Sequence, residues 1–573
     1  MDGAEYPWEL ALGAFPLAGG GVEFRVWAPR ASALALRTGG RDHELTAIGH
    51  GVYERHLPDA AAGDDYVYLV DGQALPDPSS RWQPAGIRGP SRVVDAGALR
   101  WSAGGWPGLA LGELVIYELH IGAFSEAGTF EGAIPHLRAL RELGVTAIEL
   151  MPIAEWPGQR GWGYDGVYLS APFGPYGGPA GLAALVDAAH AEGLGVILDV
   201  VYNHLGASGM KAVEAFGPYH SDRHETFWGV GLNYDGPDCD PVREWVIQSA
   251  CQWVGDYRID GLRLDAVHAI LDSSARHLLA QLAERVRAVN PQALVIAESA
   301  LNDPRVIRPV ELGGYGTDAQ WADDFHHALR VLLTGDRDGY YADFGRIADL
   351  AKAYIRPFVH DGDYSELRRR RFGAPALDRA PEQFVVFSQN HDQVGNRAFG
   401  DRLPDDARRL AAFCTLLSPF TPLLFMGEEY GEPRPFQFFS DHIDAEIATA
   451  TREGRRREFA SFASFDRELP DPQAELTFQT SKLSREEDPG LRALYASLLQ
   501  LRSELVGREV RTAFDEDARS LRVGRDGVEL VCNFARSESR IAIEGSEIVL
   551  ATASAELTDG HLSLPALSGA VVR

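Results

Sequence analysis

Cysteine is scarce in this chain, with four residues among 573. Cys239, Cys251, Cys414 and Cys532 form no CxxC pair, which argues against a zinc ribbon or a CxxC redox motif. So few thiols in so long a chain also do not make a disulfide scaffold. We therefore expect the cysteines to be reduced.

Positive charge and long apolar runs are lacking too. The 54 Lys and Arg residues are outnumbered by 82 Asp and Glu residues, which gives a formal net charge of −28. That charge repels phosphate backbones and anionic lipid surfaces, so we expect neither nucleic acid nor a membrane as a partner. No basic residue precedes Arg25, unlike in a secretory signal, and the longest apolar stretch, 411–426, is shorter than the roughly 18 residues of a membrane span. The sequence thus predicts a cytoplasmic protein.

Hydrophobic residues, at 45% of the chain, provide material for several large cores. Near the N-terminus, apolar and charged residues alternate over 22–26, and the apolar run 66–70 is closed by the turn pair Asp71-Gly72. This pattern predicts an immunoglobulin-like β-sandwich, similar to a carbohydrate-binding module, over residues 1–105. The glycine-rich stretch 101–111 marks its end.

The middle of the chain alternates helical patterns with short apolar runs. Leu182, Leu185, Val186 and Ala189 fall on one face of a helix, and the apolar run 196–198 that follows is typical of a strand buried on both faces. This alternation predicts parallel βαβ units. Eight candidate strands lie at 114–120, 147–152, 196–201, 261–265, 294–298, 318–321, 384–389 and 423–428.

Eight such units close a (β/α)8 TIM barrel, which we predict over residues 106–505 as part of an α/β protein. Helix 491–505 would be its last helix, and alternating runs after it predict a C-terminal antiparallel β domain over 506–573. The arginine runs 368–371 and 455–457 are interpreted as solvated charge, with a role at a substrate site as the alternative.

Polar residues follow several of the predicted strands at the end where barrel enzymes carry their active sites. Asp199, Asp265, Glu298 and Asp392 occupy such positions, and Arg263 shares a strand with Asp265. Taken singly, each residue is also explained as a helix cap, a structural ion pair or a satisfied histidine or carboxylate. Together, several carboxylates at one barrel mouth indicate catalysis, because burying a carboxylate is costly unless it is paired.

A retaining glycosidase needs this combination. One carboxylate attacks the anomeric carbon, and a second carboxyl group about 5–5.5 Å away protonates the leaving oxygen. Arg263 would keep Asp265 ionised, and the apolar run 294–297 predicts a less polar setting that favours the protonated form of Glu298. Asp392 would bind ring hydroxyls, and Tyr164 is either an aromatic platform for the sugar or a core residue.

Four segments carry a family resemblance. DVVYNH (199–204), GLRLDAVH (261–268), VIAES (295–299) and QNHDQVGN (389–396) resemble, in order, the signature regions of the α-amylase family of glycoside hydrolases. The resemblance implies Asp265 as nucleophile, Glu298 as acid/base and Asp392 as transition-state stabiliser. It further implies substrate-binding residues at or near the −1 subsite, which are Tyr164, Asp199, His204, Arg263, His391, Gln393 and Asn396.

Within that family the chain resembles the branch that hydrolyses malto-oligosyltrehalose to a maltodextrin and trehalose. The resemblance is carried by DAQWADDFHHAL (318–329), by His268 where many α-amylases have Lys, and by FRVWAP (24–29). It implies further substrate contacts from Trp228, His268, Asp324, Phe325, His326, His327, Tyr341 and Arg371. Asn203 stands where many α-amylases have a calcium ligand, but the rest of that site has no match, so we predict no metal and no cofactor.

Two alternatives remain open at this point. The N-terminal domain is also typical of glucan-branching and debranching enzymes, which would change the reaction but keep the family. A non-catalytic glucan-binding protein could use the same barrel, because a fold does not determine function, although retention of all three carboxylates argues against it.

Overall fold

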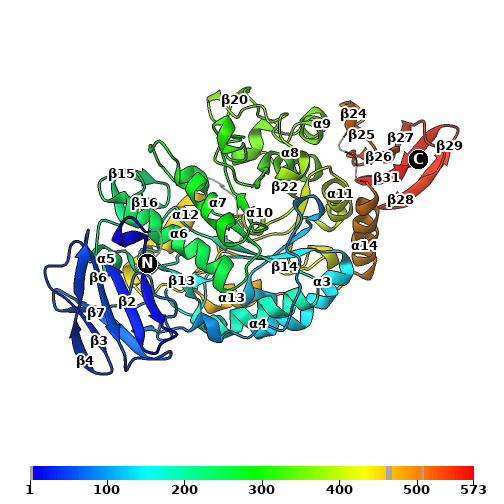
Figure 1. The fold of residues 1–573 in the computed structure, drawn as a ribbon. Coiled ribbons are helices and arrows are strands. Elements are labelled where there is room, and N and C mark those ends of the chain that lie inside the picture. Colours follow the sequence, from blue (N-terminus) through cyan, green and yellow to red (C-terminus); the bar gives the residue numbers. More distant parts are fainter. Residues whose placement is uncertain (1–3, 460–467, 506, 508) are drawn as a thin grey trace.

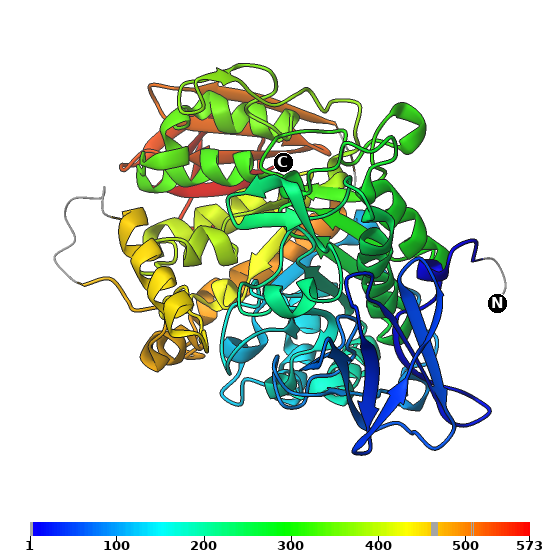
Figure 2. The same cartoon turned by 90° about the vertical axis from the view of Figure 1, so that its left-hand side faces the viewer.

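The computed structural model describes residues 4–459, 468–505, 507 and 509–573. Its parallel barrel lies between two sets of antiparallel sheets, one at each end of the molecule (Figure 1). A view turned by 90° has the same order, with the first strands of the chain and the last ones on opposite sides of the barrel (Figure 2). The sheets fall inside the three predicted domains, whose limits stay a prediction.

The barrel is closed by eight parallel strands in chain order, which confirms the predicted fold class. Every residue of these strands is buried, because helices cover the barrel outside and side chains fill it inside. The strands are β10 (Ile116–Leu119), β11 (Ala147–Leu150), β14 (Gly195–Val200), β17 (Gly261–Leu264), β18 (Leu294–Ala297), β19 (Ala319–Trp321), β22 (Phe384–Phe387) and β23 (Thr421–Phe425).

Most of the observed barrel strands end one to three residues before the predicted ends. The prediction extended the fifth strand to Glu298 and the eighth to Glu428, whereas β18 ends at Ala297 and β23 at Phe425. Because all eight strands are parallel, the candidate site residues that follow them gather at one end of the barrel.

Helices connect the strands on the outside of the barrel. The predicted apolar face of α4, with Leu182, Leu185, Val186 and Ala189, is buried as expected. Helix α14 begins after Asp488, whose carboxylate accepts hydrogen bonds from two backbone amides of its first turn. The larger helices of this body are α3 (Leu137–Leu143), α4 (Gly178–Ala191), α6 (Cys239–Asp256), α7 (Leu278–Val289), α8 (Asp323–Thr334), α9 (Ile347–Ile355), α11 (Asp405–Leu416), α12 (Ala445–Phe459), α13 (Glu475–Ser481) and α14 (Pro489–Glu504).

The N-terminal strands form two antiparallel sheets that pack face to face. The ring of Phe24 in one sheet lies 5.0 Å from the ring of Tyr66 in the other, so the sandwich core lies between them. The turn pair Asp71-Gly72 closes the hairpin of β7 and β8, as its sequence predicts. The sheets contain β1 (Gly13–Pro16), β2 (Val22–Trp27), β5 (Thr46–Gly49) and β6 (Val52–Leu57) in one, and β3 (Leu34–Thr38), β4 (Arg41–Glu44), β7 (Asp65–Val70), β8 (Gln73–Leu75) and β9 (Ser91–Arg92) in the other.

The C-terminal strands also form two antiparallel sheets, and they join the barrel through α11. Arg525 donates hydrogen bonds to the carbonyls of Leu417 and Ser418 just after that helix. The Sγ atoms of Cys414 and Cys532 lie 3.9 Å apart across the same contact, and all four cysteines are free thiols. The strands are β24 (Val510–Asp515), β25 (Ser520–Arg525), β26 (Val528–Asn533), β28 (Ile548–Ala551) and β31 (Ser568–Val572) in one sheet, and β27 (Ser539–Ala542), β29 (Glu556–Thr558) and β30 (His561–Leu564) in the other.

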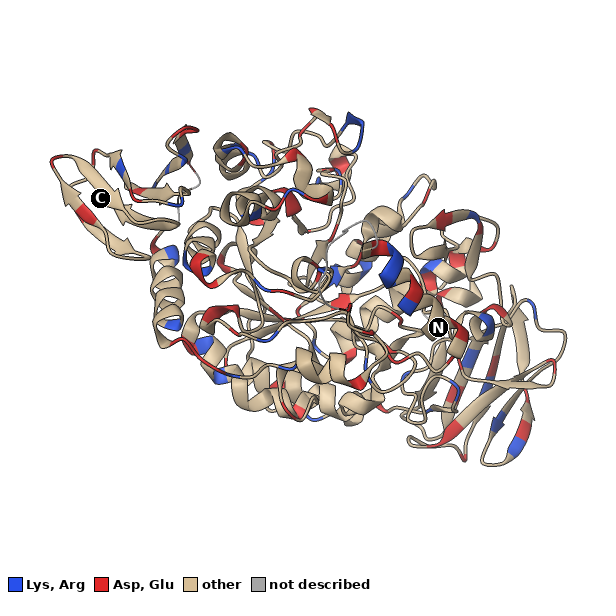
Figure 3. Ribbon diagram, turned by 180° about the vertical axis from the view of Figure 1, so that it is seen from behind, with Lys and Arg blue, Asp and Glu red and all other residues tan. Residues whose placement is uncertain are grey.

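Short elements between the strands complete the barrel mouth. They are α1 (Ile121–Phe124), α2 (Phe130–Ala133), α5 (Met210–Glu214), α10 (His391–Gly395), and the hairpins of β12 (Ala154–Glu155) with β13 (Tyr168–Pro172), β15 (His220–Thr226) with β16 (Gly229–Leu232), and β20 (Tyr364–Ser365) with β21 (Arg370–Arg371). Charged residues of both signs are spread over the helices and loops (Figure 3). In the part of the chain that the structure describes, no helix is both long and apolar enough to cross a membrane.

Candidate active site

Arg263 is the centre of the site. Its Nη1 atom donates hydrogen bonds to Asp199 Oδ2 at 2.8 Å and Asp265 Oδ1 at 2.9 Å, and its Nη2 atom lies 3.2 Å from Glu298 Oε2. The guanidinium is fully buried and lies over the ring of Trp321, 4.2 Å from the ring centre. Asp199, Asp265 and Glu298 together compensate the buried charge of this cation. They come from three neighbouring strands, so the structure brings these predicted residues together.

Asp265 and Glu298 are further fixed by groups of the backbone and of the third strand's loop. Ala266 adopts a left-handed conformation with φ 41° and ψ 51°, and its N–H donates to Glu298 Oε2 at 2.6 Å. For a non-glycine residue this conformation costs about 1–2 kcal/mol, which the surrounding contacts must offset. Asn203 Nδ2 donates to Asp265 Oδ2 at 3.0 Å.

The predicted less polar setting of Glu298 is not what the structure has. The apolar run 294–297 forms β18, but the Glu298 carboxylate turns away from it toward Arg263 and the Ala266 amide. The apolar run 294–297 correctly predicts a strand. The surroundings of Glu298, which follows the strand, are set instead by the polar residues at the barrel mouth.

His391 connects the site to the first strand. Its Nδ1 atom lies 2.5 Å from Glu118 Oε1, and its backbone N–H donates to Glu118 Oε2 at 2.8 Å. Burial lowers the pKa of His391, but the carboxylates of Asp392 and Glu118 outweigh it and raise the pKa to about 10. His391 is therefore an imidazolium at neutral pH, with both ring nitrogens acting as donors.

Tyr164 acts through its hydroxyl group as well as its ring. The hydroxyl donates to Asp199 Oδ2 at 2.7 Å and lies 2.7 Å from His391 Nε2, so it accepts from the imidazolium. The two rings stack with centres 5.3 Å apart. Burial, with Asp265 nearby, raises the pKa of Asp199 to about 7 although Arg263 opposes the shift. The sequence left a platform and a core role open for Tyr164, and the structure gives it polar contacts within the site.

Asp392 lies in the first turn of α10, beside His391. Asn396 Nδ2 donates to Asp392 Oδ1 at 2.8 Å, and His391 Nε2 lies 3.5 Å from Asp392 Oδ2. Burial and the charge of Glu298 raise the pKa of Asp392, while His391 opposes the shift. Gln393, which is buried, accepts a hydrogen bond from the Tyr341 hydroxyl at 3.2 Å. Asp392 and Asn396 are therefore joined directly, whereas Gln393 and Tyr341 form a pair next to them.

The hairpin of β15 and β16 brings Trp228 to the site. Its ring lies parallel to that of His204, with centres 6.2 Å apart, and 5.9 Å from the ring of His268. Trp228 remains 45% exposed, so part of its ring is free to contact a ligand. His204 bonds to Asn203 Oδ1 and to the carbonyl of Tyr164, which fixes its ring beneath Trp228.

The predicted contacts on α8 are mostly not brought to the site. Phe325 is fully buried and packs against Tyr354 and Phe420 between the helices and the barrel. Asp324 accepts hydrogen bonds from Asn302 Nδ2 at 2.9 Å and from the His360 amide at 2.8 Å, so it fastens two loops. The helical period of α8 turns consecutive residues toward different neighbours, which the motif alone does not reveal.

His326 and His327 are buried behind the site as well. The Nε2 atom of His326 lies 3.1 Å from the Tyr341 hydroxyl, and His327 packs against the rings of Tyr340 and Phe344. Burial lowers the pKa of His327 to about 3, which keeps it neutral. These histidines support the Tyr341 wall of the site instead of facing solvent.

Arg371 stands apart, on the exposed hairpin of β20 and β21. Together with Phe372 and Asn302 it lines a cavity of about 360 Å³. Of these three residues, Asn302 lies on the loop that follows Glu298. Arg370 is exposed beside it, whereas the guanidinium of Arg368 lies 3.9 Å from the ring centre of Phe372.

Two site residues were missed by sequence reasoning. Glu118 lies inside the first predicted strand, 114–120, and was not among the predicted site residues, but it holds His391. Asp323 is the first residue of α8, two positions after β19 ends at Trp321, and it lies near enough to Glu298 and Asp392 to interact with their charges. Burial and the charges of those two residues raise the pKa of Asp323 to about 8. Its position just after the sixth predicted strand, 318–321, was the signal that could have found it.

No group of three His, Cys, Asp or Glu side chains among the described residues has the arrangement of a metal site. Asn203, at the position of an α-amylase calcium ligand, donates to Asp265 instead. The chemistry that the site offers is that of two carboxyl groups on either side of one guanidinium, with an imidazolium and a third carboxyl group beside them.

The fold and this site define an α-amylase-type glycoside hydrolase, and the family model "Alpha amylase, catalytic domain" matches residues 103–225. A malto-oligosyltrehalose trehalohydrolase from Rhizobium sp. (strain M-11) is 45% identical over 98% of this chain and 99% of its own length. One from Saccharolobus solfataricus is 46% identical over 84% of this chain and 85% of its own. The chain belongs to the malto-oligosyltrehalose trehalohydrolase family.

A solved structure is similar to this chain over nearly its full length. A protein from Salmonella typhimurium, provisionally named an alpha amylase, superposes with a TM-score of 0.90 and 38% identity over 98% of this chain and 99% of its own. A pullulanase complexed with maltotetraose from Anoxybacillus sp. LM18-11 superposes with a TM-score of 0.72 over 99% of this chain and 88% of its own, but at 17% identity it shares the fold alone.

Proposed function

We propose that this enzyme hydrolyses the α-1,4-glucosidic bond next to the terminal trehalose of malto-oligosyltrehalose. The products are trehalose and a maltodextrin shortened by that end, which is a step of trehalose biosynthesis. The names of the full-length relatives support the substrate, and the contact of one guanidinium with both Asp265 and Glu298 carries the chemistry.

In the first step, a carboxylate oxygen of Asp265 attacks the anomeric carbon of the glucose unit on the glucan side. Glu298 gives its proton to the glycosidic oxygen, which leaves as a hydroxyl group of trehalose. Arg263 holds that carboxylate in place, because its Nη1 atom donates a hydrogen bond to Asp265 Oδ1 at 2.9 Å. The covalent glycosyl–enzyme bond formed here replaces the bond that is broken.

In the second step, Glu298 takes a proton from water, and the resulting hydroxide oxygen attacks the anomeric carbon. Asp265 leaves as a carboxylate, and the sugar keeps its original configuration after two inversions. Asp392 and His391 bind the ring hydroxyls, and the negative charge of Asp392 stabilises the oxocarbenium-like transition state more than the ground state.

Recognition of trehalose requires contacts beyond the cleaved bond. Trp228 and His268 lie beside one another on the side of the fourth strand, with ring centres 5.9 Å apart. They offer stacking and a hydrogen-bonding group to the sugar that leaves. Arg371, at the cavity that follows Glu298, is a more distant candidate for the same side.

The deciding experiment is incubation with maltotriosyltrehalose and chromatography of the products. Trehalose and maltotriose are expected in equal amounts. New branches on amylose, detected by iodine staining, or cleavage of pullulan would instead identify a branching or debranching enzyme. Asp265→Asn should lower kcat by at least about 10³-fold while oligosaccharide binding persists in calorimetry. Unchanged turnover of that variant would remove the proposed nucleophile.

A further inference from the structure

Arg455 is not solvated charge, although its sequence context predicts that. Its side chain is 14% exposed, and its Nη2 atom donates to the carbonyl of Gly395 at 2.9 Å and lies 3.4 Å from that of Arg397. These carbonyls stand at the C-terminal end of α10. The other nitrogen, Nη1, pairs with Glu458 at 2.9 Å on its own helix.

Helix α10 carries Asp392 and is too short to be stable without contacts from other parts of the chain. Five residues form little more than one turn, and an isolated helix of that length is not stable in water. Its N-terminal end is fixed by Asn390, whose side chain accepts from the Gln393 amide at 2.8 Å. At its C-terminal end the unpaired carbonyls carry partial negative charge, which a guanidinium satisfies.

A series of packed aromatic rings lies between Arg455 and the site. The Arg455 guanidinium lies 5.3 Å from the ring centre of Phe438, and that ring lies 5.2 Å from the ring of Trp162. Trp162 in turn lies 5.8 Å from the ring of His391. Gly395 is pressed against Trp162 so closely that a Cβ atom there would overlap its ring. Arg455 therefore closes a packed unit around α10.

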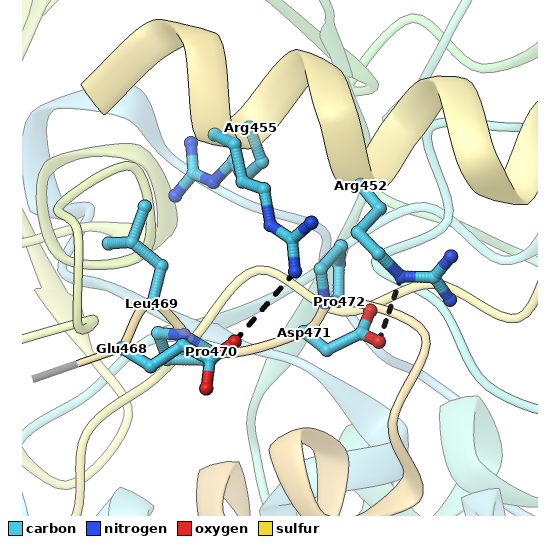
Figure 4. Close-up of a pocket in the computed structure, with 8 residues that line it drawn as sticks. Arg452, Arg455, Glu468, Leu469, Pro470, Asp471 and Pro472 are labelled. Atoms are coloured by element: carbon cyan, nitrogen blue, oxygen red, sulfur yellow. Dashed lines mark hydrogen bonds and ion pairs between the residues drawn. The ribbon is translucent and has the colours of Figure 1, made fainter. Parts of the chain in front are cut away.

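The helix that carries Arg455 is itself anchored. Arg452 and Arg455 both stand on α12, and the Nε atom of Arg452 donates to Asp471 Oδ2 at 2.9 Å (Figure 4). The two arginines border a cavity of about 330 Å³ between α12 and segment 468–472. Arg455 thus connects α10 to a fixed element outside the barrel.

We propose that Arg455 is a positioning residue that holds Asp392 in its catalytic place by binding the C-terminal carbonyls of α10. The inference rests on the proposed function, because Asp392 is the group that is positioned. Without Arg455, α10 loses the contact at one end, and Asp392 shifts or fluctuates relative to the reacting sugar. A misplacement of about 1 Å costs up to about 10²-fold in rate.

The test compares Arg455→Met, which keeps the length of the stem, with Arg457→Met. Arg457 stands on the same helix with its side chain 74% exposed, so the pair is matched for helix and for chemistry. With an α-malto-oligosaccharyl fluoride, Arg455→Met should lower kcat about 10- to 100-fold with little change in KM, and Arg457→Met should stay within about twofold of the parent. Arg455→Lys keeps a cation and should recover part of the loss. Equal activity of the two Met variants overturns the inference.

A double-mutant cycle tests whether the effect passes through Asp392. In an Asp392→Asn background, Arg455→Met should change kcat by less than about twofold, because there is no carboxylate left to place. The same loss in both backgrounds means that Arg455 acts elsewhere, and the inference fails. Turnover by Asp392→Asn at the parent rate would instead contradict the proposed function. Should Arg455→Met not fold, Arg455→Lys against Arg457→Lys gives the same comparison, with equal rates counting against the inference.

Discussion

The Nη2 atom of Arg263 lies 3.2 Å from Oε2 of Glu298, while Nη1 of the same guanidinium bonds to Asp265. The proposed nucleophile and the proposed acid/base, 33 positions apart in the chain, therefore meet on one planar cation. This contact fixes their separation without a direct bond between them. It also makes the site sensitive to any change of Arg263.

Replacement of Arg263 by Met should abolish turnover and weaken the fold. Asp199, Asp265 and Glu298 would be left near one another with no cation between them, which costs about 3–5 kcal/mol for breaking a buried pair. We expect kcat to fall at least about 10²-fold, measured on maltotriosyltrehalose beside a thermal melt. Arg263→Lys keeps the charge but loses the paired N–H donors of the guanidinium, so its kcat should lie between that of the parent and that of Arg263→Met. Activity of Arg263→Met within tenfold of the parent would contradict this.

Glu118→Gln should lower stability in a pH-dependent way. The pKa of His391 is raised to about 10 from an ordinary 6.5, partly by Glu118, so its contribution is fully present below pH 6.5 and lost as pH rises toward 10. The free energy of unfolding should fall by about 2–4 kcal/mol below pH 6.5, and the difference from the parent should shrink toward pH 10. Denaturant unfolding at pH 6, 8 and 10 measures it. A constant difference at all three values would mean that charge is not the cause.

Asp323→Asn should stabilise the protein in mildly alkaline solution. The pKa of Asp323 is raised to about 8 from an ordinary 3.8, so the folded state loses stability as pH rises from about 4 to 8 and the carboxylate forms beside Glu298 and Asp392. The variant should melt at the parent temperature near pH 4 and above it at pH 8–9.

The matched control for that variant is Asp240→Asn, an exposed acid in the first turn of α6. It shares the position of Asp323 at a helix start but lies outside the site. A pH-dependent gain in Tm from Asp240→Asn as large as that from Asp323→Asn would assign the effect to the helix end instead of the catalytic carboxylates.

Trp228→Ala should weaken substrate binding more than it slows the chemical step. The ring lies over His204 and beside His268, where it can stack on a sugar. Loss of one such contact is worth about 0.5–1.5 kcal/mol, so KM for maltotriosyltrehalose should rise about 2- to 13-fold. Phe514→Ala removes an aromatic side chain that is similarly exposed on the C-terminal sheet and should leave KM unchanged. A fall in kcat with no change in KM would mean that Trp228 acts on the chemical step instead of on substrate binding.

The barrel and its mouth could be predicted from the sequence because both follow from local periodicity. Apolar runs such as 196–198 have no polar residue to face water, so they must be strands buried on both sides. Asp265 and Glu298 come directly after β17 and β18, Asp392 comes shortly after β22, and parallel strands bring their ends together. The fold class and the meeting of the carboxylates needed no more information than this.

Local patterns in the sequence are enough to predict Asp265, Glu298 and Asp392 at the barrel mouth, whereas the packing of distant segments decides which side chains touch there. Glu118 and His391 are 273 positions apart, and their contact exists because the closed barrel sets β10 beside β23, next to β22. Phe325 and Asp324 are neighbours in one motif, yet one enters the core and the other fastens two loops. Periodicity fixes the side on which a residue lies, but the partner it meets there depends on how distant segments pack.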